Sequence, residues 1–244
     1  MKKIKLFCLP YAGGSASVYY KWKKYLHPQI DLYPLELAGR DRRFVEPLYA
    51  SWNDALEDVS GFVKERLDDS PVALFGYSMG SVLAFELAHQ IKEWTGQDPQ
   101  HLFVAARAAP HNPQIRKLIH HLPDQKFLEE IIKIGGISEK IVESKELLHM
   151  FIPILRADFK MIESYEYCAK ETKLYCDISV LDGVADDISN EGLTAWKVHT
   201  HGQTSVYKFI GGHFFIHNNI NPIVDLINQT LFQSNISYIQ QKGV

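Results

Sequence analysis

The chain has 244 residues, of which 46% are hydrophobic and 12% aromatic, so it is long enough and apolar enough to bury a core of its own. Its net charge of −3 comes from 26 Lys and Arg against 29 Asp and Glu. This mixture argues against a nucleic-acid-binding surface, which concentrates basic side chains on one face.

The N-terminal stretch "MKKIKLFCLP" carries lysines ahead of an apolar patch. The patch is too short for a signal peptide or a membrane span, and Lys5 interrupts it, so we expect a first β-strand and no membrane association. The three cysteines, Cys8, Cys168 and Cys176, have no metal-ligand spacing. Their odd number suits a reducing compartment, and we expect a cytoplasmic protein with free thiols.

Short β-rich segments alternate with helical patterns along the chain. The segments predicted as strands begin at Ile4, Asp31, Val72, His101, Ile178 and Ser205. Apolar residues three or four apart predict amphipathic helices from Trp52 and from Ser81, and a final helix after Gln229 that ends in a loose "QQKGV". The alternation predicts an α/β fold, with a mostly parallel sheet covered by helices on both faces.

The region from about 111 to 167 has no convincing strand and only helical patterns, such as "PDQKFLEEIIKI" and "SKELLHMFIPILRADFKMIESYEY". Connections between neighbouring strands are usually far shorter. We interpret this region as a helical lid inserted into a single domain that spans 1–244. The alternative is a set of packing helices with no role in access to a site.

The stretch "VALFGYSMGSVLAFELAHQ" places Ser78 between Gly76 and Gly80, where a predicted strand turns into a predicted helix. This is the context of a nucleophile elbow, in which tiny neighbours let the strand and the helix approach a strained serine. The Ser78 hydroxyl would then be exposed above the sheet. The amide N–H of Met79, at the helix N-terminus, would point to the place where an oxyanion forms.

A serine hydroxyl is a poor nucleophile at neutral pH, so it needs a base and an acid that orients the base. In this type of fold they follow the serine in the order acid, then histidine. The downstream histidines are His199, His201, His213 and His217. His213 is the preferred base because it follows a Gly-Gly pair at the carboxyl end of a predicted strand, whereas His199 and His201 precede that strand.

For the acid, the segment "ISVLDGVADD" runs from a predicted strand into a turn at Gly183. We favour Asp186, with Asp187 as the runner-up. Asp182 would still lie in or beside the strand, and Glu191 is a further candidate downstream.

A second oxyanion donor is expected from the loop after the first strand, "LPYAGGSA", whose glycines let main-chain N–H groups approach a substrate. The donor would be the amide of Tyr11 or Ala12. A phosphate-binding loop is excluded here because no G-K-[ST] follows the glycines.

Several of these segments, taken together, resemble the type II thioesterases of nonribosomal peptide and polyketide assembly lines, which are stand-alone proteins of the α/β-hydrolase fold. The segments are "LFCLPYAGGSASVYYKW", "LELAGRDRRFVEPLY", "LFGYSMGSVLAFELA", "LPDQKFLEEIIKIGGISEKI", "PILRADFKMIESYEY" and "GGHFF". The resemblance covers about residues 6–215. It departs from the family at Ala38, where proline is common, and at Asp41, where glycine is common.

The resemblance implies a catalytic triad of Ser78 as nucleophile, Asp186 as acid and His213 as base. It also implies that Met79 and the loop of Tyr11 and Ala12 form the oxyanion hole, and that 111–167 is the lid over an acyl pocket. The implied activity is hydrolysis of acyl groups from the phosphopantetheine arm of acyl or peptidyl carrier proteins, through an acyl-enzyme.

No metal and no dissociable cofactor is implied, since phosphopantetheine belongs to the partner carrier protein, and we expect a monomer. Carrier proteins are commonly acidic, which makes a basic rim a candidate for docking. The basic candidates are Arg40, Arg42, Arg43, Arg116 and Lys117. Arg156 and Asp158 are expected simply to pair with each other within the lid.

Rival interpretations keep the same triad. A small-molecule esterase or an acyltransferase would use the same three side chains, since a fold alone does not set function. A non-catalytic binder of carrier proteins is the rival from another class, and its function would survive Ser78→Ala.

Overall fold

The computed structural model describes residues 2–112, 118–137 and 143–241. The proposed docking residues Arg116 and Lys117 lie outside the described residues.

A parallel sheet of six strands in the order β2-β1-β3-β4-β5-β6 forms the centre of the molecule. The strands are β1 (Ile4–Leu9), β2 (Ile30–Pro34), β3 (Val72–Tyr77), β4 (His101–Ala105), β5 (Asp177–Gly183) and β6 (Thr204–Phe209). Every predicted strand is present and begins at, or one residue before, its predicted start. The strand order reverses between β1 and β3, and ligands of such sheets bind at the carboxyl ends of the strands at that switch point.

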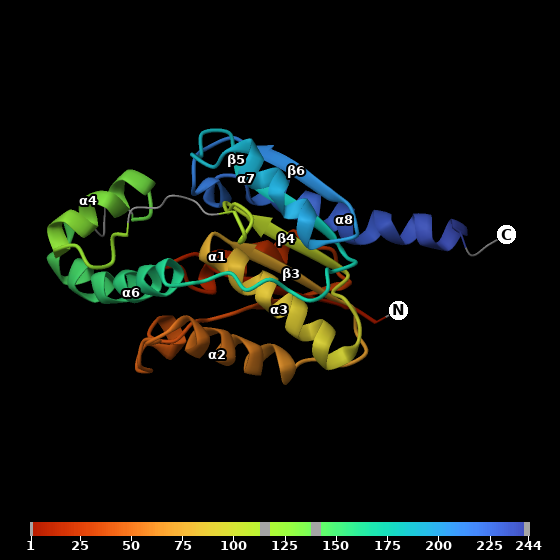
Figure 1. Ribbon diagram of the computed structural model, residues 1–244, viewed down its shortest axis with the longest axis horizontal. Helices are drawn as coiled ribbons and strands as arrows, with labels where there is room; N and C mark the ends of the chain where they lie inside the picture. Colours follow the sequence, from red (N-terminus) through yellow and green to blue (C-terminus); the bar gives the residue numbers. More distant parts are fainter. Residues whose placement is uncertain (1, 113–117, 138–142, 242–244) are drawn as a thin grey trace.

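Helices cover both faces of the sheet (Figure 1). They are α1 (Ser17–Tyr20), α2 (Trp52–Lys64), α3 (Met79–Thr95), α4 (Asp124–Ile134), α6 (Lys145–Glu163), α7 (Asn190–Thr194) and α8 (Ile220–Gln241), with 3-10 turns η1 (Lys21–Lys24), η2 (Asp41–Arg43), η3 (Ala195–His199) and η4 (Phe215–His217). Side chains alternate along each strand, so Leu74 of β3 packs with α2 and α3 while Phe75 packs with α8. The α/β prediction is therefore confirmed, and the parallel sheet with helices on both faces is the arrangement that the resemblance to α/β hydrolases implied.

The last helix starts earlier than the sequence suggested. It begins at Ile220 rather than after Gln229, and Gln240 and Gln241 belong to it rather than to a loose end. Its buried residues, Ile223, Val224, Ile227 and Leu231, keep helical spacing from the start. Pro222 falls in the first turn, where the missing N–H has no helical acceptor to lose, so it does not break the helix.

The connection between β4 and β5 holds α4 and α6, which lie side by side at one end of the molecule (Figure 1). Its described residues between 118 and 167 contain no strand, as predicted. Their inner side chains form a small core of their own from Ile119, Phe127, Ile131 and Leu155. Whether this insertion opens and closes as a lid stays a prediction.

Helix α6 changes from exposed to buried at Pro153. The proline also removes one backbone hydrogen bond from the helix interior. None of the residues 145–153 is buried. Beyond the proline, Ile154, Leu155, Asp158, Met161 and Ile162 are all buried. The second half of α6 is thus part of the packed body.

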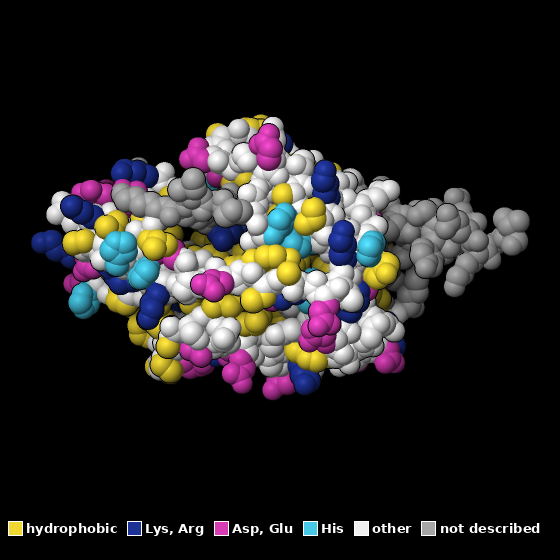
Figure 2. Space-filling model, viewed as in Figure 1, with side chains coloured by type: hydrophobic (Ala, Val, Ile, Leu, Met, Phe, Trp, Pro, Cys, Tyr) yellow, Lys and Arg dark blue, Asp and Glu magenta, His cyan; other side chains and the backbone are white. Residues whose placement is uncertain are grey.

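Basic and acidic side chains are interspersed over the face seen in Figure 2. Among the described helices, none is long and apolar enough to cross a membrane. The three cysteines are free, with Cys8 and Cys176 buried and Cys168 exposed.

Candidate active site

Ser78 occupies a sharp turn between β3 and α3. Its backbone has φ 51° and ψ −109°, a strained conformation that L-residues rarely adopt. The Ser78 N–H donates to the carbonyl of Ala105 at 2.8 Å, which ties the turn to the neighbouring strand. The strain is therefore held in place by the sheet itself.

The two flanking glycines are required by close backbone contacts. A Cβ on Gly76 would lie 2.2 Å from the carbonyl oxygen of Gly80, so strand and helix could not approach. A Cβ on Gly80 would lie 2.3 Å from the Leu9 oxygen and 2.6 Å from the Pro10 oxygen. The elbow therefore packs directly against the end of β1 and the loop that follows it.

Ser78, His213 and Asp186 form one hydrogen-bonded chain. The Ser78 Oγ lies 3.1 Å from His213 Nε2, and His213 Nδ1 lies 2.9 Å from Asp186 Oδ2. Because a carboxylate only accepts, Nδ1 carries the imidazole proton, and Nε2 is left to accept from the serine hydroxyl. The loops that carry His213 and Asp186 pack tightly, since a Cβ on Gly183 would lie 2.5 Å from the Gly211 and Gly212 oxygens.

The surroundings of Asp186 favour its ionised form. Burial alone would raise its pKa, but the hydrogen bond and charge of His213 and the N–H of Asp187 lower the pKa below its usual value. Asp182 nearby has the opposite balance: burial raises its pKa to about 6 despite its ion pair with Lys208 at 2.7 Å. Asp186 is thus the carboxylate best prepared to stabilise an imidazolium.

The other acid candidates lie elsewhere. Asp182 is in β5, as expected, and it is fully buried. Asp187 is exposed, and its N–H donates to Asp186 Oδ1 at 2.8 Å, so its backbone supports the neighbouring carboxylate. Glu191 is exposed in the first turn of α7.

The other histidines have different settings. His199 is buried, its Nε2 lies 2.7 Å from His111 Nδ1, and burial lowers its pKa to about 3. His201 is exposed and packs on the Tyr175 ring. His217 is exposed, and its Nε2 lies 2.9 Å from the hydroxyl of Tyr11, which lines the same pocket as Ser78.

The predicted oxyanion donors lie around Ser78. Met79 is the first residue of α3, so its N–H has no acceptor within the helix. Tyr11 and Ala12 line the same pocket as Ser78. Among the described residues, the N–H groups of Tyr11 and Ala12 have no hydrogen-bond acceptor.

A pocket with about 300 Å³ of empty space, its open mouth included, lies over Ser78 and His213. Its walls are mainly apolar. They comprise Tyr11, Ala12, Ile131, Ile134, Gly136, Leu155, Phe159 and Phe214. The walls from α4 and α6 come from the predicted lid, so the insertion does shape the site.

Comparison with known proteins agrees with this geometry. The family model of the thioesterase domain matches residues 4–231. The chain belongs to the thioesterase family. It is therefore an enzyme of the class that hydrolyses thioesters.

Individual relatives are similar over nearly the whole chain. LgrE of Brevibacillus parabrevis, named a linear gramicidin dehydrogenase, is 35% identical over 97% of this chain and 90% of its own length. The crystal structure of ClbQ from the colibactin NRPS/PKS pathway has a TM-score of 0.91 at 36% identity, over 97% of this chain and all of ClbQ. The type II thioesterase BorB from the borrelidin biosynthetic cluster has a TM-score of 0.85 at 33% identity, over 94% of this chain and 93% of BorB.

The sequence analysis missed Tyr77, a side chain of this thioesterase that holds the His213 loop by a hydrogen bond. Tyr77 precedes Ser78 and is fully buried, and its hydroxyl donates to the carbonyl of His213 at 2.6 Å. It also accepts from the N–H of Ile216. The only signal in the sequence was its place inside the elbow motif, where a buried hydroxyl must find a partner.

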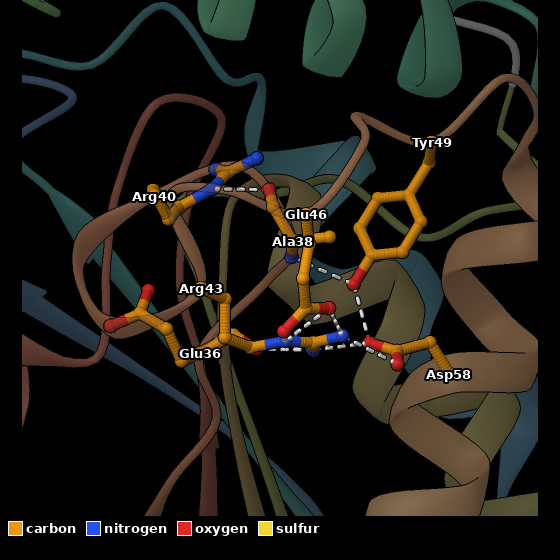
Figure 3. A network of polar contacts seen from close by, with 7 residues as sticks. All are labelled: Glu36, Ala38, Arg40, Arg43, Glu46, Tyr49 and Asp58. Carbon is orange, nitrogen blue, oxygen red and sulfur yellow. Dashed lines mark hydrogen bonds and ion pairs between the residues drawn. The ribbon is translucent and has the colours of Figure 1, made fainter.

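The docking role considered for the basic residues is wrong for Arg40, which is buried, whereas Arg43 is only half-buried. Arg40 is only 4% exposed and pairs with Asp158. The Arg43 guanidinium lies between Glu46 and Asp58, as Figure 3 shows, and it also donates to the carbonyl of Glu36. Both guanidinium groups are occupied inside the thioesterase. Arg42 is exposed.

The expected pairing of Arg156 with Asp158 is also wrong. Arg156 binds the Asp124 carboxylate and the carbonyls of His120 and Leu122, all within the insertion. Arg156 and Asp158 are two positions apart on α6, so their side chains point in different directions. Arg156 therefore pairs within the insertion, and Asp158 pairs with Arg40.

Proposed function

We propose that this chain hydrolyses acyl groups from the phosphopantetheine arm of carrier proteins in nonribosomal peptide or polyketide synthesis. Ser78 is the nucleophile, His213 the general base and acid, and Asp186 the group that orients and stabilises His213. The observation that carries the proposal is the hydrogen-bonded chain from Ser78 through His213 to Asp186, at the mouth of an apolar pocket.

In the first half-reaction, Ser78 Oγ attacks the thioester carbonyl carbon while His213 Nε2 takes the hydroxyl proton. The carbonyl oxygen becomes an oxyanion that accepts from the N–H of Met79 and from that of Tyr11 or Ala12. The C–S bond then breaks. The phosphopantetheine thiol leaves with the proton from His213, and the acyl group stays on Ser78.

In the second half-reaction, His213 takes a proton from water, and the hydroxide attacks the acyl carbon. The bond to Ser78 Oγ breaks, and the proton on His213 returns to the serine. The products are the free carboxylic acid and the resting enzyme. Because a thiolate is a good leaving group, selectivity depends on pocket shape and access more than on acid strength.

The carrier protein partner follows from the same proposal, with the phosphopantetheine arm as the only prosthetic group involved. Similarity to ClbQ, a protein of the colibactin NRPS/PKS pathway, and to BorB, a type II thioesterase, supports it. The free thiols of Cys8, Cys168 and Cys176 support a cytoplasmic location. A monomeric state stays a prediction, which sedimentation would test.

The deciding experiment follows the mass of an acetyl-loaded carrier protein by intact-mass spectrometry. Wild-type enzyme should remove the acetyl mass faster than it cleaves a p-nitrophenyl ester, and the Ser78→Ala variant should do neither. If the carrier stays loaded while the ester is cleaved, the substrate is a small ester and the esterase alternative holds. Loss of the acyl mass with equal speed in the Ser78→Ala variant would refute the triad itself.

Two other outcomes have clear signatures in the same assay. An acyltransferase would give an acylated thiol or amine instead of the free acid. A non-catalytic binder would bind the loaded carrier protein and leave its mass unchanged.

The name of the relative LgrE raises a redox alternative, which the sequence does not favour. Dinucleotide-binding enzymes of α/β type need a G-x-G-x-x-G turn for the pyrophosphate. This chain contains no G-x-G, and its strand-to-helix turn after β3 carries Ser78.

A further inference from the structure

Asp158 is a buried carboxylate of α6 that the mechanism above does not use. It is 1% exposed. Its Oδ2 accepts from the backbone N–H of Gly13 at 2.7 Å, and Arg40 donates to its two oxygens at 2.7 and 2.8 Å. Arg40 also donates to the carbonyl of Gly14 at 3.1 Å. A helix of the insertion is thus fastened to the loop after β1.

That loop contains the tight turn that supplies the proposed oxyanion donors. The Gly14 N–H donates to the Tyr11 carbonyl at 2.8 Å, and Gly13 in the third position has φ +78°, where glycine is favoured. Tyr11 and Ala12 are the first two residues of the turn, and they face the pocket with Ser78. The N–H of Gly13 is bound by Asp158 and is not available to a substrate.

The turn is held from two opposite directions. On the sheet side, Gly80 of the elbow leaves no room for a Cβ against the carbonyls of Leu9 and Pro10. On the side of α6, Asp158 and Arg40 hold the turn by hydrogen bonds, and the Leu155 side chain packs against Gly13. A turn fixed on one side alone would keep its fold but would let its amides tilt.

We propose that Asp158 is a positioning residue, whose hydrogen bond to the Gly13 N–H holds the Tyr11–Gly14 turn so that its amides point at the oxyanion. The inference rests on the proposed function, in which Tyr11 or Ala12 donates to that oxyanion. It makes the second half of α6 a fixed part of the catalytic framework, whatever the rest of the insertion does.

The chemistry of the pair agrees with a positioning role. Taking two charges out of water costs free energy, and buried pairs are often no more stabilising than apolar side chains of the same size. Here every oxygen of Asp158 accepts a hydrogen bond, so the pair is well satisfied. Such a two-bond pair fixes the orientation of the carboxylate: with both oxygens bound by Arg40, Asp158 Oδ2 faces the Gly13 N–H.

The test needs variants that differ only in the contact to Gly13. Arg40→Met removes the buried cation, so no uncompensated charge remains in either variant. In this background, Asp158→Asn keeps an oxygen acceptor for the Gly13 N–H, and Asp158→Leu has a similar size without an acceptor. Asp124→Asn is the matched control, because it breaks the ion pair of Arg156 inside the insertion and touches no part of the turn.

The readouts are kcat and KM for p-nitrophenyl butyrate, and inhibition by butylboronic acid, which forms a tetrahedral adduct on the serine. The Leu variant should have a kcat about 10- to 100-fold below that of the Asn variant, since one lost oxyanion donor costs about 100-fold or more. Its KM should change less than about threefold, and boronate inhibition should weaken in parallel with kcat. Asp124→Asn should behave as wild type.

Equal kcat values and equal boronate inhibition in the Asn and Leu variants would overturn the inference, provided that Ser78→Ala is inactive. An active Ser78→Ala variant would instead overturn the proposed function. If the Leu variant does not fold by circular dichroism, Asp158→Ser in the same background replaces it, because its short hydroxyl does not reach Gly13. The kcat and the boronate inhibition of the Ser variant are then compared with those of the Asn variant, and equal values would again overturn the inference.

Discussion

The two sides of the pocket are built in different ways. The sheet side comprises the elbow and the loops after β5 and β6, and it carries the polar groups Ser78, Asp186 and His213. Close backbone contacts at its glycines hold it in place. The insertion side, from α4 and α6, contributes apolar walls such as Ile131 and Phe159, which are held by side-chain packing.

This difference separates two tasks. Backbone contacts that leave no room for a Cβ fix atoms to a fraction of an ångström, which proton transfer requires. Packed apolar walls can be reshaped without disturbing those atoms. Changes on the sheet side should therefore reduce turnover of every substrate, and changes to the apolar walls of the insertion side should redistribute turnover among acyl groups.

The largest effect is expected from His213, the proposed base on the sheet side. His213→Ala should lower kcat by about 10⁴-fold or more for both short and long acyl substrates, because triad members act as a unit. The melting temperature should stay close to that of wild type, measured by circular dichroism. A variant that loses activity toward one chain length only would contradict the separation of tasks.

A smaller but still large effect is expected from Asp186, the proposed acid. Asp186→Asn should lower kcat by about 10³- to 10⁴-fold, since the amide cannot stabilise the imidazolium. Asp187→Asn is the matched control, because its side chain is exposed and only its backbone N–H contacts Asp186. It should stay within about threefold of wild type in the same assay. The reverse ranking would move the acid to Asp187.

The sheet side could be predicted from the sequence because its signals are local. The residues of the turn "GYSMG" and of the loops after β5 and β6 are enough to predict the local backbone conformation. The order of the strands then brings these segments together. The contacts of Asp158 could not be predicted: it meets Arg40 and Gly13 across more than a hundred residues. No spacing rule reports a pair formed by tertiary packing, so the nearby Arg156 looked like the better partner.

The insertion side offers the test of selectivity. Phe159→Ala should enlarge the pocket, and the ratio of kcat/KM for octanoyl over acetyl thioesters should rise by about tenfold, the scale of a pocket changed by a few methylenes. Phe159 lines the pocket and packs on Phe127, so its loss opens the wall toward α4. Leu147→Ala, exposed in the first half of α6, is the control and should leave the ratio unchanged. An equal loss of kcat/KM for acyl groups of every length would show instead that Phe159 supports the catalytic step itself.

The smallest effect is expected at Glu36, which lies outside both sides of the pocket. Burial, opposed by the N–H of Ala16 and reinforced by Asp41, raises its pKa to about 7, and its carboxylate points away from Arg43 in Figure 3. The backbone of the neighbouring Asp41 is strained, since it has φ +43°, where glycine is favoured.

The pKa of Glu36 rises from 4.5 to about 7 on folding. Its favourable contribution to stability is therefore complete below pH 4.5, where the carboxyl is protonated in both the unfolded and the folded chain. The contribution is lost as the pH rises through about 7, because the buried carboxyl must then ionise. Glu36→Gln keeps the oxygen for the Ala16 N–H and has no charge to bury. The variant should melt about 1–3 °C above wild type at pH 8 and together with it at pH 4. Thermal melting at both pH values checks this, with kcat expected to stay unchanged. A loss of kcat without a change in melting temperature would place Glu36 in the sheet side of the site, behind the turn that Asp158 holds.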